Sequence, residues 1–280
     1  MLGQSLDKLD QPAPVARTVR DLVLFDQVIT AGFAPAYAAD PHDIRIGLAP
    51  QFFWQGVDSE VGPITLAAVE RLRAGGVGVF ETDVPDVVAK ALPTEVTILG
   101  NDARIGLANY LTEQNTGVDA AGFFAQLGSN TLRMFERFPV PAREQYEAAL
   151  RTRDELRAEL AQFFAANAFD ALVFPPAPIP PPPQGDHATV EILGAQVPVV
   201  AAMGRAPSVG SVGGLASLVL PAGLTRSGLP IGLEFAAAAG SDRRLLSIGL
   251  TLESILGPVL APQPTANRSR HSIAQVEQDS

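Results

Sequence analysis

Residues 43–82 carry a strand–helix–strand pattern, and this pattern narrows the range of folds open to the chain more than any other segment does. Residues 43–49 alternate polar and apolar side chains, which predicts a short strand. Asp58 then stands where an N-cap is needed for a helix that ends at Gly75, and residues 77–82 predict a second strand. Such βαβ units build parallel sheets with helices on their faces, so the sequence predicts an α/β fold.

The rest of the chain predicts helices and strands on both sides of this unit. Helices are predicted over residues 15–29, 142–167 and 241–256, with less regular helical structure over 85–135. Strands are predicted over residues 171–174, 197–203, 215–220 and 229–235. A proline-rich run over residues 175–183 directly follows one of these strands. Because prolines prevent regular hydrogen bonding, we interpret the run as a rigid connector inside the fold rather than as a ligand for an SH3-like domain.

The composition predicts one folded domain with an acidic surface. Hydrophobic residues make up 47% of the 280 residues and charged residues 18%, which is typical of a globular protein. The formal net charge of −10 argues against a nucleic-acid partner, since a phosphate backbone needs a basic face. Polar, proline-rich sequence after Pro258 predicts a domain over residues 1–262 and a disordered tail over residues 263–280.

The sequence carries no signal for secretion, membrane insertion or disulfide bonding. The chain has no cysteine, which excludes disulfides and thiolate metal sites and fits a reducing compartment. Residues 1–8 lack the basic and apolar regions of a secretory signal. The longest apolar run, residues 215–224, is too short to span a bilayer. We therefore expect a cytoplasmic protein with no membrane partner.

Few residues are suited to nucleophilic or metal chemistry. The three histidines, His42, His187 and His271, lie in polar contexts, and no Gly-x-Ser-x-Gly motif is present. We interpret them as surface residues rather than as members of a Ser-His-Asp triad, and their scatter argues against a metal site. The glycine-rich residues 210–214 have no lysine after them, so a tight backbone crossing is favoured over a phosphate-binding loop. We expect neither a metal nor a cofactor.

The acidic residues and the lysines indicate a catalytic or metal site no more strongly than the histidines do. The acidic residues that suggest paired carboxylates are Asp58, Glu60, Glu81, Asp83 and Asp86. Each falls at a helix start or in a turn, where capping and solvation are the better interpretation. The only lysines are Lys8 and Lys90, and neither has a pair of serines beside it. A desolvated lysine base is therefore hard to place.

The order of short motifs resembles the amidase signature family, and within it the mandelamide and indoleacetamide hydrolase-like group. Residues 10–19 are similar to the family's Gly-Pro-Met/Val-Ala-Arg-Thr/Ser-Val helix start, and residues 110–117 and 169–175 match further segments. The most specific match is a block at residues 213–225, with its Pro-Ala-Gly, followed by a Gly-Leu-Pro-x-Gly motif at residues 228–232. The resemblance covers nearly all of the chain up to about Pro258.

The resemblance implies a partial amidase-signature fold, an α/β/α sandwich with a mixed, mostly parallel sheet. It also implies hydrolysis of a carboxamide to a carboxylic acid and ammonia. In that family a serine attacks the amide carbon, a second serine on a cis peptide relays its proton, and a neutral lysine acts as base. Those groups lie upstream of the segment that corresponds to Val15-Ala16-Arg17, and no Gly-Gly-Ser-Ser-Gly-Gly-type loop occurs here. No catalytic residue is assigned, and Lys8 does not stand at the position of the family's base.

The resemblance therefore predicts the C-terminal portion of an amidase, which shapes the cavity for a small amide and is inactive alone. Two departures from the family pattern are Ala13 in place of glycine and Pro176-Ala177 in place of a turn that carries threonine. The residues expected to line the cavity are Thr112, Pro176, Ala177, Ser208 and Ser211. Exposed strand edges predict either self-association or pairing with a separate N-terminal amidase segment. The alternative is a non-catalytic binding or assembly module.

Overall fold

The computed structural model describes residues 9, 13–30, 36–115, 117–128, 131–132, 135, 138–183 and 189–257. The predicted tail over residues 263–280, together with Lys8, His187 and His271, lies outside these residues. The proline-rich run is described over residues 175–183, where it forms no helix or strand, as its prolines predict.

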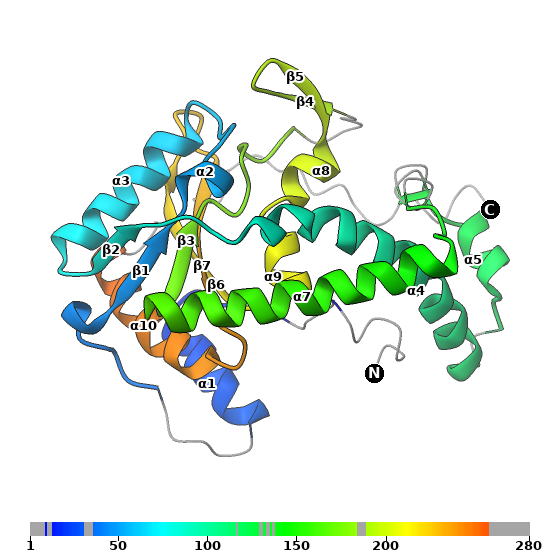
Figure 1. The fold of residues 1–280 in the computed structure, drawn as a ribbon, viewed down its shortest axis with the longest axis horizontal. Coiled ribbons are helices and arrows are strands. Elements are labelled where there is room, and N and C mark those ends of the chain that lie inside the picture. Colours follow the sequence, from blue (N-terminus) through cyan, green and yellow to red (C-terminus); the bar gives the residue numbers. More distant parts are fainter. Residues whose placement is uncertain are drawn as a thin grey trace, which may run out of the picture.

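A mixed five-stranded sheet forms the centre of the described structure (Figure 1). Its order is β2 (Gly78–Glu81), β1 (Arg45–Leu48), β3 (Ala171–Phe174), β7 (Pro230–Ala237) and β6 (Ala216–Leu224). The first three strands are parallel to one another, β7 is antiparallel to β3, and β6 is antiparallel to β7. Only β7 of these strands therefore runs against the others, which confirms the predicted mixed, mostly parallel sheet.

Helices cover both faces of the sheet, so the fold is the predicted α/β/α sandwich. One face packs against α1 (Val19–Ile29), α3 (Val61–Ala74) and α10 (Asp242–Leu256). The other face packs against α2 (Pro50–Phe53), α4 (Ala91–Glu113), α7 (Arg143–Asn167) and α9 (Pro207–Gly213). Alternate strand residues supply the two cores: Val173 and Phe235 point to the first, Leu172 and Ala236 to the second.

Smaller elements lie around this sandwich. They are the 3₁₀ turns η1 (Pro41–Asp43) and η2 (Asp86–Lys90), the helices α5 (Ala120–Ala125) and α8 (Val199–Gly204), and the strands β4 (Thr189–Ile192) and β5 (Ala195–Pro198). Strands β4 and β5 pair as an antiparallel hairpin that stands away from the main sheet, next to α8 (Figure 1).

Three predictions about element boundaries are wrong, each for a local reason. The strand predicted over residues 197–203 is instead the end of β5 followed by α8, because a short apolar run does not distinguish a strand from a helix. The first helix begins at Val19 rather than residue 15, since the Thr18 hydroxyl accepts a hydrogen bond from the Asp21 N–H. Asp58 does not occupy the N-cap of α3. Its carboxylate instead accepts from the N–H of Glu60, the N-cap residue of α3.

The glycine-rich residues 210–214 form no phosphate loop, and the tight backbone crossing predicted for them is the end of a helix. They are the second half of α9 and its left-handed C-terminal residue, Gly214, which has φ of 65°. The chain then enters β6 at Ala216. A glycine at this position ends a helix without the steric cost that a side chain would bring.

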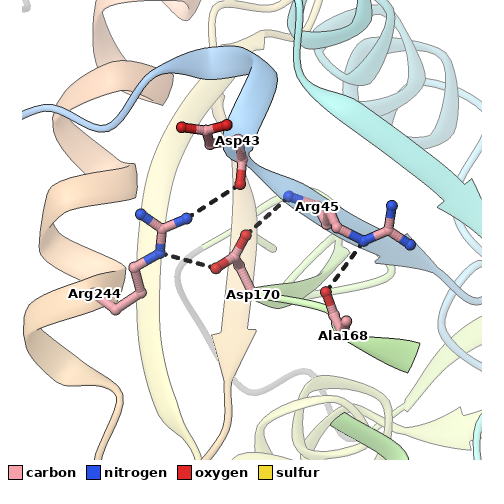
Figure 2. Close-up of polar contacts among 5 residues, drawn as sticks. All are labelled: Asp43, Arg45, Ala168, Asp170 and Arg244. Atoms are coloured by element: carbon pink, nitrogen blue, oxygen red, sulfur yellow. Dashed lines mark hydrogen bonds and ion pairs between the residues drawn. The ribbon is translucent and has the colours of Figure 1, made fainter. Parts of the chain in front are cut away.

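A polar junction fixes the amino ends of β1 and β3 (Figure 2). The Asp170 carboxylate accepts from the Arg45 backbone N–H and from Arg244 Nε, each at 2.9 Å. Arg244 also donates to the Asp43 carbonyl at 3.2 Å, and Arg45 Nε donates to the Ala168 carbonyl at 3.2 Å. Segments that are distant in sequence therefore meet at one carboxylate, at the end of the sheet opposite the loops that follow the parallel strands.

Candidate functional site

The loops at the carboxyl ends of β1, β2 and β3 are the place to look for a ligand site. In open α/β sheets, ligands bind beyond the carboxyl ends of parallel strands, where loops converge. Here those loops are residues 49–60 after β1, residues 82–90 after β2 and the proline-rich run after β3. A cavity of about 350 Å³ opens between the first two, with Ala49, Phe52 and Pro85 in its wall.

An aromatic stack anchors the loop after β1 to the end of β3. Phe53 of α2 lies face to face with Phe174, with ring centroids 4.0 Å apart and planes within 7°. Both side chains are buried, and Phe52 meets Phe53 edge to face at 4.8 Å. Stacked and edge-to-face rings of this kind gain energy beyond their buried area. The stack therefore gives this end of the sheet a rigid apolar base.

Polar contacts join the same loop to two other segments. Arg205, between α8 and α9, donates to the Gln55 carbonyl at 2.7 Å and to the Phe53 carbonyl at 3.5 Å. Burial lowers the pKa of the Arg205 guanidinium from its ordinary value, but an arginine remains charged at neutral pH. The Asp58 N–H donates to the Pro178 carbonyl at 2.7 Å, which ties the loop to the proline-rich run. These bonds hold three loops in a fixed arrangement.

The structure places the five predicted cavity residues at separate positions. Pro176 and Ala177 are half-buried at the carboxyl end of β3, where Pro176 lies against Gly232 of β7. Ser208 and Ser211 come together on α9, whereas Thr112 is exposed near the C-terminal end of α4. Ser211 and Thr112 each donate to a carbonyl of their own helix, at 3.3 and 2.9 Å.

Ser208 is fully buried and belongs to a helix–helix contact. Its Oγ lies 2.5 Å from both Glu95 Oε2 of α4 and the Gly204 carbonyl, so one hydroxyl proton serves two acceptors. Glu95 and Thr112 are separated along α4 by about 25 Å, at a rise of about 1.5 Å per residue. Thr112 therefore cannot share one small cavity with Ser208.

Glu234 is a buried carboxylate on β7 that the sequence analysis did not single out. It is 6% exposed on β7, in register with Phe174 on one side and Val219 on the other. Ser217 Oγ donates to Glu234 Oε1 at 2.7 Å. Burial raises the pKa of this carboxyl group, and the Ser217 hydrogen bond opposes the rise. The sequence feature that could have identified Glu234 is a carboxylate within an otherwise apolar strand.

The lysine and the histidine within the described ranges lie at the surface rather than in a catalytic arrangement. Lys90 is exposed at the end of η2, and His42 lies against Gly76 at the surface. In those ranges no group of three His, Cys, Asp or Glu side chains is placed to hold a metal ion. Nor is any helix there long and apolar enough to cross a membrane.

The sequence matches the family model described as Amidase over residues 4–246. Mandelamide hydrolase of Pseudomonas putida is 30% identical, and the match covers 95% of this chain and 53% of that protein. Indoleacetamide hydrolase of Agrobacterium vitis is 28% identical, with 88% of this chain and 54% of that protein covered. The chain therefore spans about half the length of the curated relatives it matches.

Solved structures show the same fold. The crystal structure of an amidase superposes with a TM-score of 0.71 at 24% identity, covering 86% of this chain and 52% of that one. A bacterial aryl acylamidase of the amidase signature family gives a TM-score of 0.65 at 20% identity, again covering 86% of this chain and 52% of that one. At these identities the likeness shows the fold alone.

Proposed function

Since the chain belongs to the amidase family, we propose that it supplies the part of an amidase that shapes the cavity for a small carboxamide. The reaction is hydrolysis of the C–N bond to a carboxylic acid and ammonia. The family match over residues 4–246 carries this proposal. Phe52, which lines the cavity and meets Phe53 edge to face, supports an aryl- or alkyl-substituted amide, because an apolar wall favours an apolar substituent.

The attacking group and its base come, in this proposal, from outside the described residues. A lysine acts as a base at neutral pH only when burial or neighbouring charge keeps it neutral, and Lys90 is exposed. The motif order around Arg17 and Gly223 supports a place in the C-terminal portion of the amidase fold, with the Ser-Ser-Lys triad in the other portion. The role of this chain is then to bind and orient the amide, which lowers the entropic cost of attack.

Pro176 and Ala177 are the predicted cavity residues that this site supports best. They follow β3 directly and lie next to the loop after β1, where the aromatic stack and Arg205 fix the backbone. Ser211 is half-buried on α9 and stays a candidate contact for the amide group. Ser208 serves the contact between α4 and α9, and Thr112 lies at the far end of α4.

A chimaera with an active relative tests this function. This chain would replace the matching 53% of the Pseudomonas putida mandelamide hydrolase, and ammonia release from mandelamide and indoleacetamide would be measured. We expect turnover by the chimaera and none by this chain alone above a heat-denatured control. A folded chimaera without turnover contradicts the proposed function. Turnover by the chain alone contradicts the placement of the nucleophile elsewhere.

A non-catalytic binding or assembly module is the second candidate function, favoured by the exposed position of Lys90. The nucleotide sequence next to the coding region separates the two. A reading frame that encodes a lysine and a Gly/Ser-rich loop supports an amidase made in two pieces. Unrelated sequence supports the module.

A further inference from the structure

The face of β6 that turns away from α1, α3 and α10 is exposed. Alternate residues of β6 point to opposite faces of the sheet, and one set lies in the core beneath these helices. The other set includes Ser217, Val219 and Pro221, all of which are exposed. Pro176 borders them, because a Cβ atom on Gly232 would lie 2.9 Å from Val219 and 3.3 Å from Pro176. Ser217 therefore lies on the same open face as an apolar surface that a small ligand can reach.

A buried carboxylate is hydrogen-bonded to Ser217 on this face. Glu234 pairs with Val219 across the β6–β7 ladder, so its side chain shares the face with Ser217. Ser217 Oγ donates to Glu234 Oε1 at 2.7 Å. The hydroxyl belongs to an exposed residue, whereas Glu234 is 6% exposed. Among the described residues the carboxylate has no second hydrogen-bond or ion-pair partner.

This pair has the features of a nucleophile and its base. A serine hydroxyl is activated for attack on a carbonyl carbon when a base within hydrogen-bond reach accepts its proton. Burial raises the pKa of the Glu234 carboxyl group, and a carboxylate with a higher pKa is a stronger base. An ion pair with a cation would weaken the base, and in the described part of the chain Glu234 has none.

The place of β6 at the edge of the described sheet supplies donors for the charge that forms during attack. In that sheet β6 pairs with β7 alone, so alternate N–H groups along its other side have no strand partner. Backbone N–H groups can stabilise the oxyanion of a tetrahedral intermediate. Val219, which is 51% exposed, and Pro176 provide an apolar contact for a small acyl group.

We propose that Ser217 is a nucleophile for small activated esters and that Glu234 is its general base. The Ser217 oxygen forms a bond to the acyl carbon, its proton passes to Glu234 Oε1, and the ester C–O bond breaks. The leaving group departs as a phenolate with the bonding electron pair, and Glu234 then releases the proton to water. Esters of acidic phenols are the substrate class, because such a phenolate leaves without being protonated. This activity is separate from the proposed amide hydrolysis, whose attacking group comes from outside the described residues.

Acetylation of this chain by p-nitrophenyl acetate tests the pair. Release of p-nitrophenolate would be followed by absorbance, and the acetylated residue would be located by peptide mass spectrometry. The test variants are Ser217→Ala and Glu234→Gln, of which the second keeps an acceptor for the Ser217 hydroxyl but is not a base. Ser227→Ala is the matched control, because Ser227 is also exposed but is hydrogen-bonded with the Thr225 hydroxyl rather than with a carboxylate. Melting temperatures establish that each variant is folded.

We expect the acetyl group on Ser217, and a rate of acetylation there that is at least about tenfold lower in Glu234→Gln. Ser217→Ala should lose the acetylated peptide, and Ser227→Ala should keep the wild-type rate. Absence of acetylation at Ser217 overturns the proposal. Equal acetylation of Ser217 and Ser227 also overturns it, since exposure alone would then explain the reaction. An unchanged rate in Glu234→Gln overturns the assignment of the base.

The two proposals have separate readouts. If this chain is acetylated at Ser217 but the chimaera releases no ammonia, the proposed amide hydrolysis alone is contradicted. If the chimaera is active but Ser217 of this chain is not acetylated, the serine–glutamate pair alone is contradicted.

Discussion

Glu234 is a buried carboxyl group whose raised pKa links stability to pH. The folded chain holds this proton more tightly than the unfolded chain, in which a glutamate has a pKa of about 4.3. The free energy of unfolding therefore falls as pH rises from that value to the raised pKa, and stays lower above it. Glu234→Gln removes the titration and keeps an acceptor for Ser217. We expect the variant to be more stable than the wild type above the raised pKa and to lose this advantage near pH 4.

Thermal unfolding between about pH 4 and pH 8 measures this effect. Glu191→Gln, at an exposed position on β4, is the matched control and should keep the wild-type profile. Parallel profiles for Glu234→Gln and the wild type would show that burial of this carboxyl group does not affect stability.

Individual side chains of the candidate site were the hardest features to predict from sequence. Ser208 and Thr112 both occur in segments that mix polar and small residues, yet one is fully buried against Glu95 and the other is exposed. Periodicity locates a helix but does not say which neighbour packs on each side. Phe53 and Arg205 gained their roles from a stack and from carbonyl contacts that only tertiary structure creates.

Helix packing makes two glycines respond in opposite ways to the same substitution. A Cβ atom on Gly100 of α4 would overlap the Pro139 carbonyl oxygen, which belongs to the backbone and cannot rotate away. A Cβ atom on Gly210 of α9 would meet no atom within 4 Å. We expect Gly100→Ala to cost about 1–3 kcal/mol of unfolding free energy despite the higher helix propensity of alanine. Gly210→Ala should gain about 0.5–1 kcal/mol.

Urea unfolding of the two variants checks this contrast, with the shift in midpoint as the readout. A neutral Gly100→Ala variant would mean that the segment before α7 is not held against α4 as described.

Sequence patterns predicted most elements of the sheet because their apolar residues have a clear period. The strand–helix–strand unit and the separate strands β3, β6 and β7 all follow from short apolar runs, alternation or helical spacing. The β4–β5 hairpin was missed. Its turn residues Leu193 and Gly194 both have positive φ, 51° and 78°, and such turns are normally signalled by Asn-Gly or Asp-Gly. A leucine at this position carries no turn signal.

At the scale of the whole molecule, the polar junction at Asp170 joins residues from distant parts of the chain. Asp170→Ala removes the acceptor of both the Arg45 N–H and Arg244 Nε, so we expect a cost of about 0.5–1.5 kcal/mol for the strand contact in addition to that of the ion pair. Arg244→Ala removes a half-exposed ion pair, with a side-chain exposure of 43% for Arg244, and the hydrogen bond to the Asp43 carbonyl. Such pairs are worth about 0.2–1 kcal/mol.

Unfolding free energies of the two single variants and the double variant test this ranking. Equal losses for Asp170→Ala and Arg244→Ala would place the energy in the ion pair rather than in the strand contact. The order of the strands in the sheet could not be predicted, because the residue pattern of one strand does not indicate which strand pairs with it.

The position of β3 between β1 and β7 also has a consequence during protein synthesis. Arg45 and Asp170, which flank the β1–β3 pairing, are separated by 125 residues. Ribosomes add about 5–20 residues per second, so β1 waits roughly 6–25 s for its central neighbour. Over that interval the edge of β1 that later pairs with β3 has no partner strand in the nascent β1–α3–β2 unit. We expect chaperone capture of the nascent chain to fall in that window.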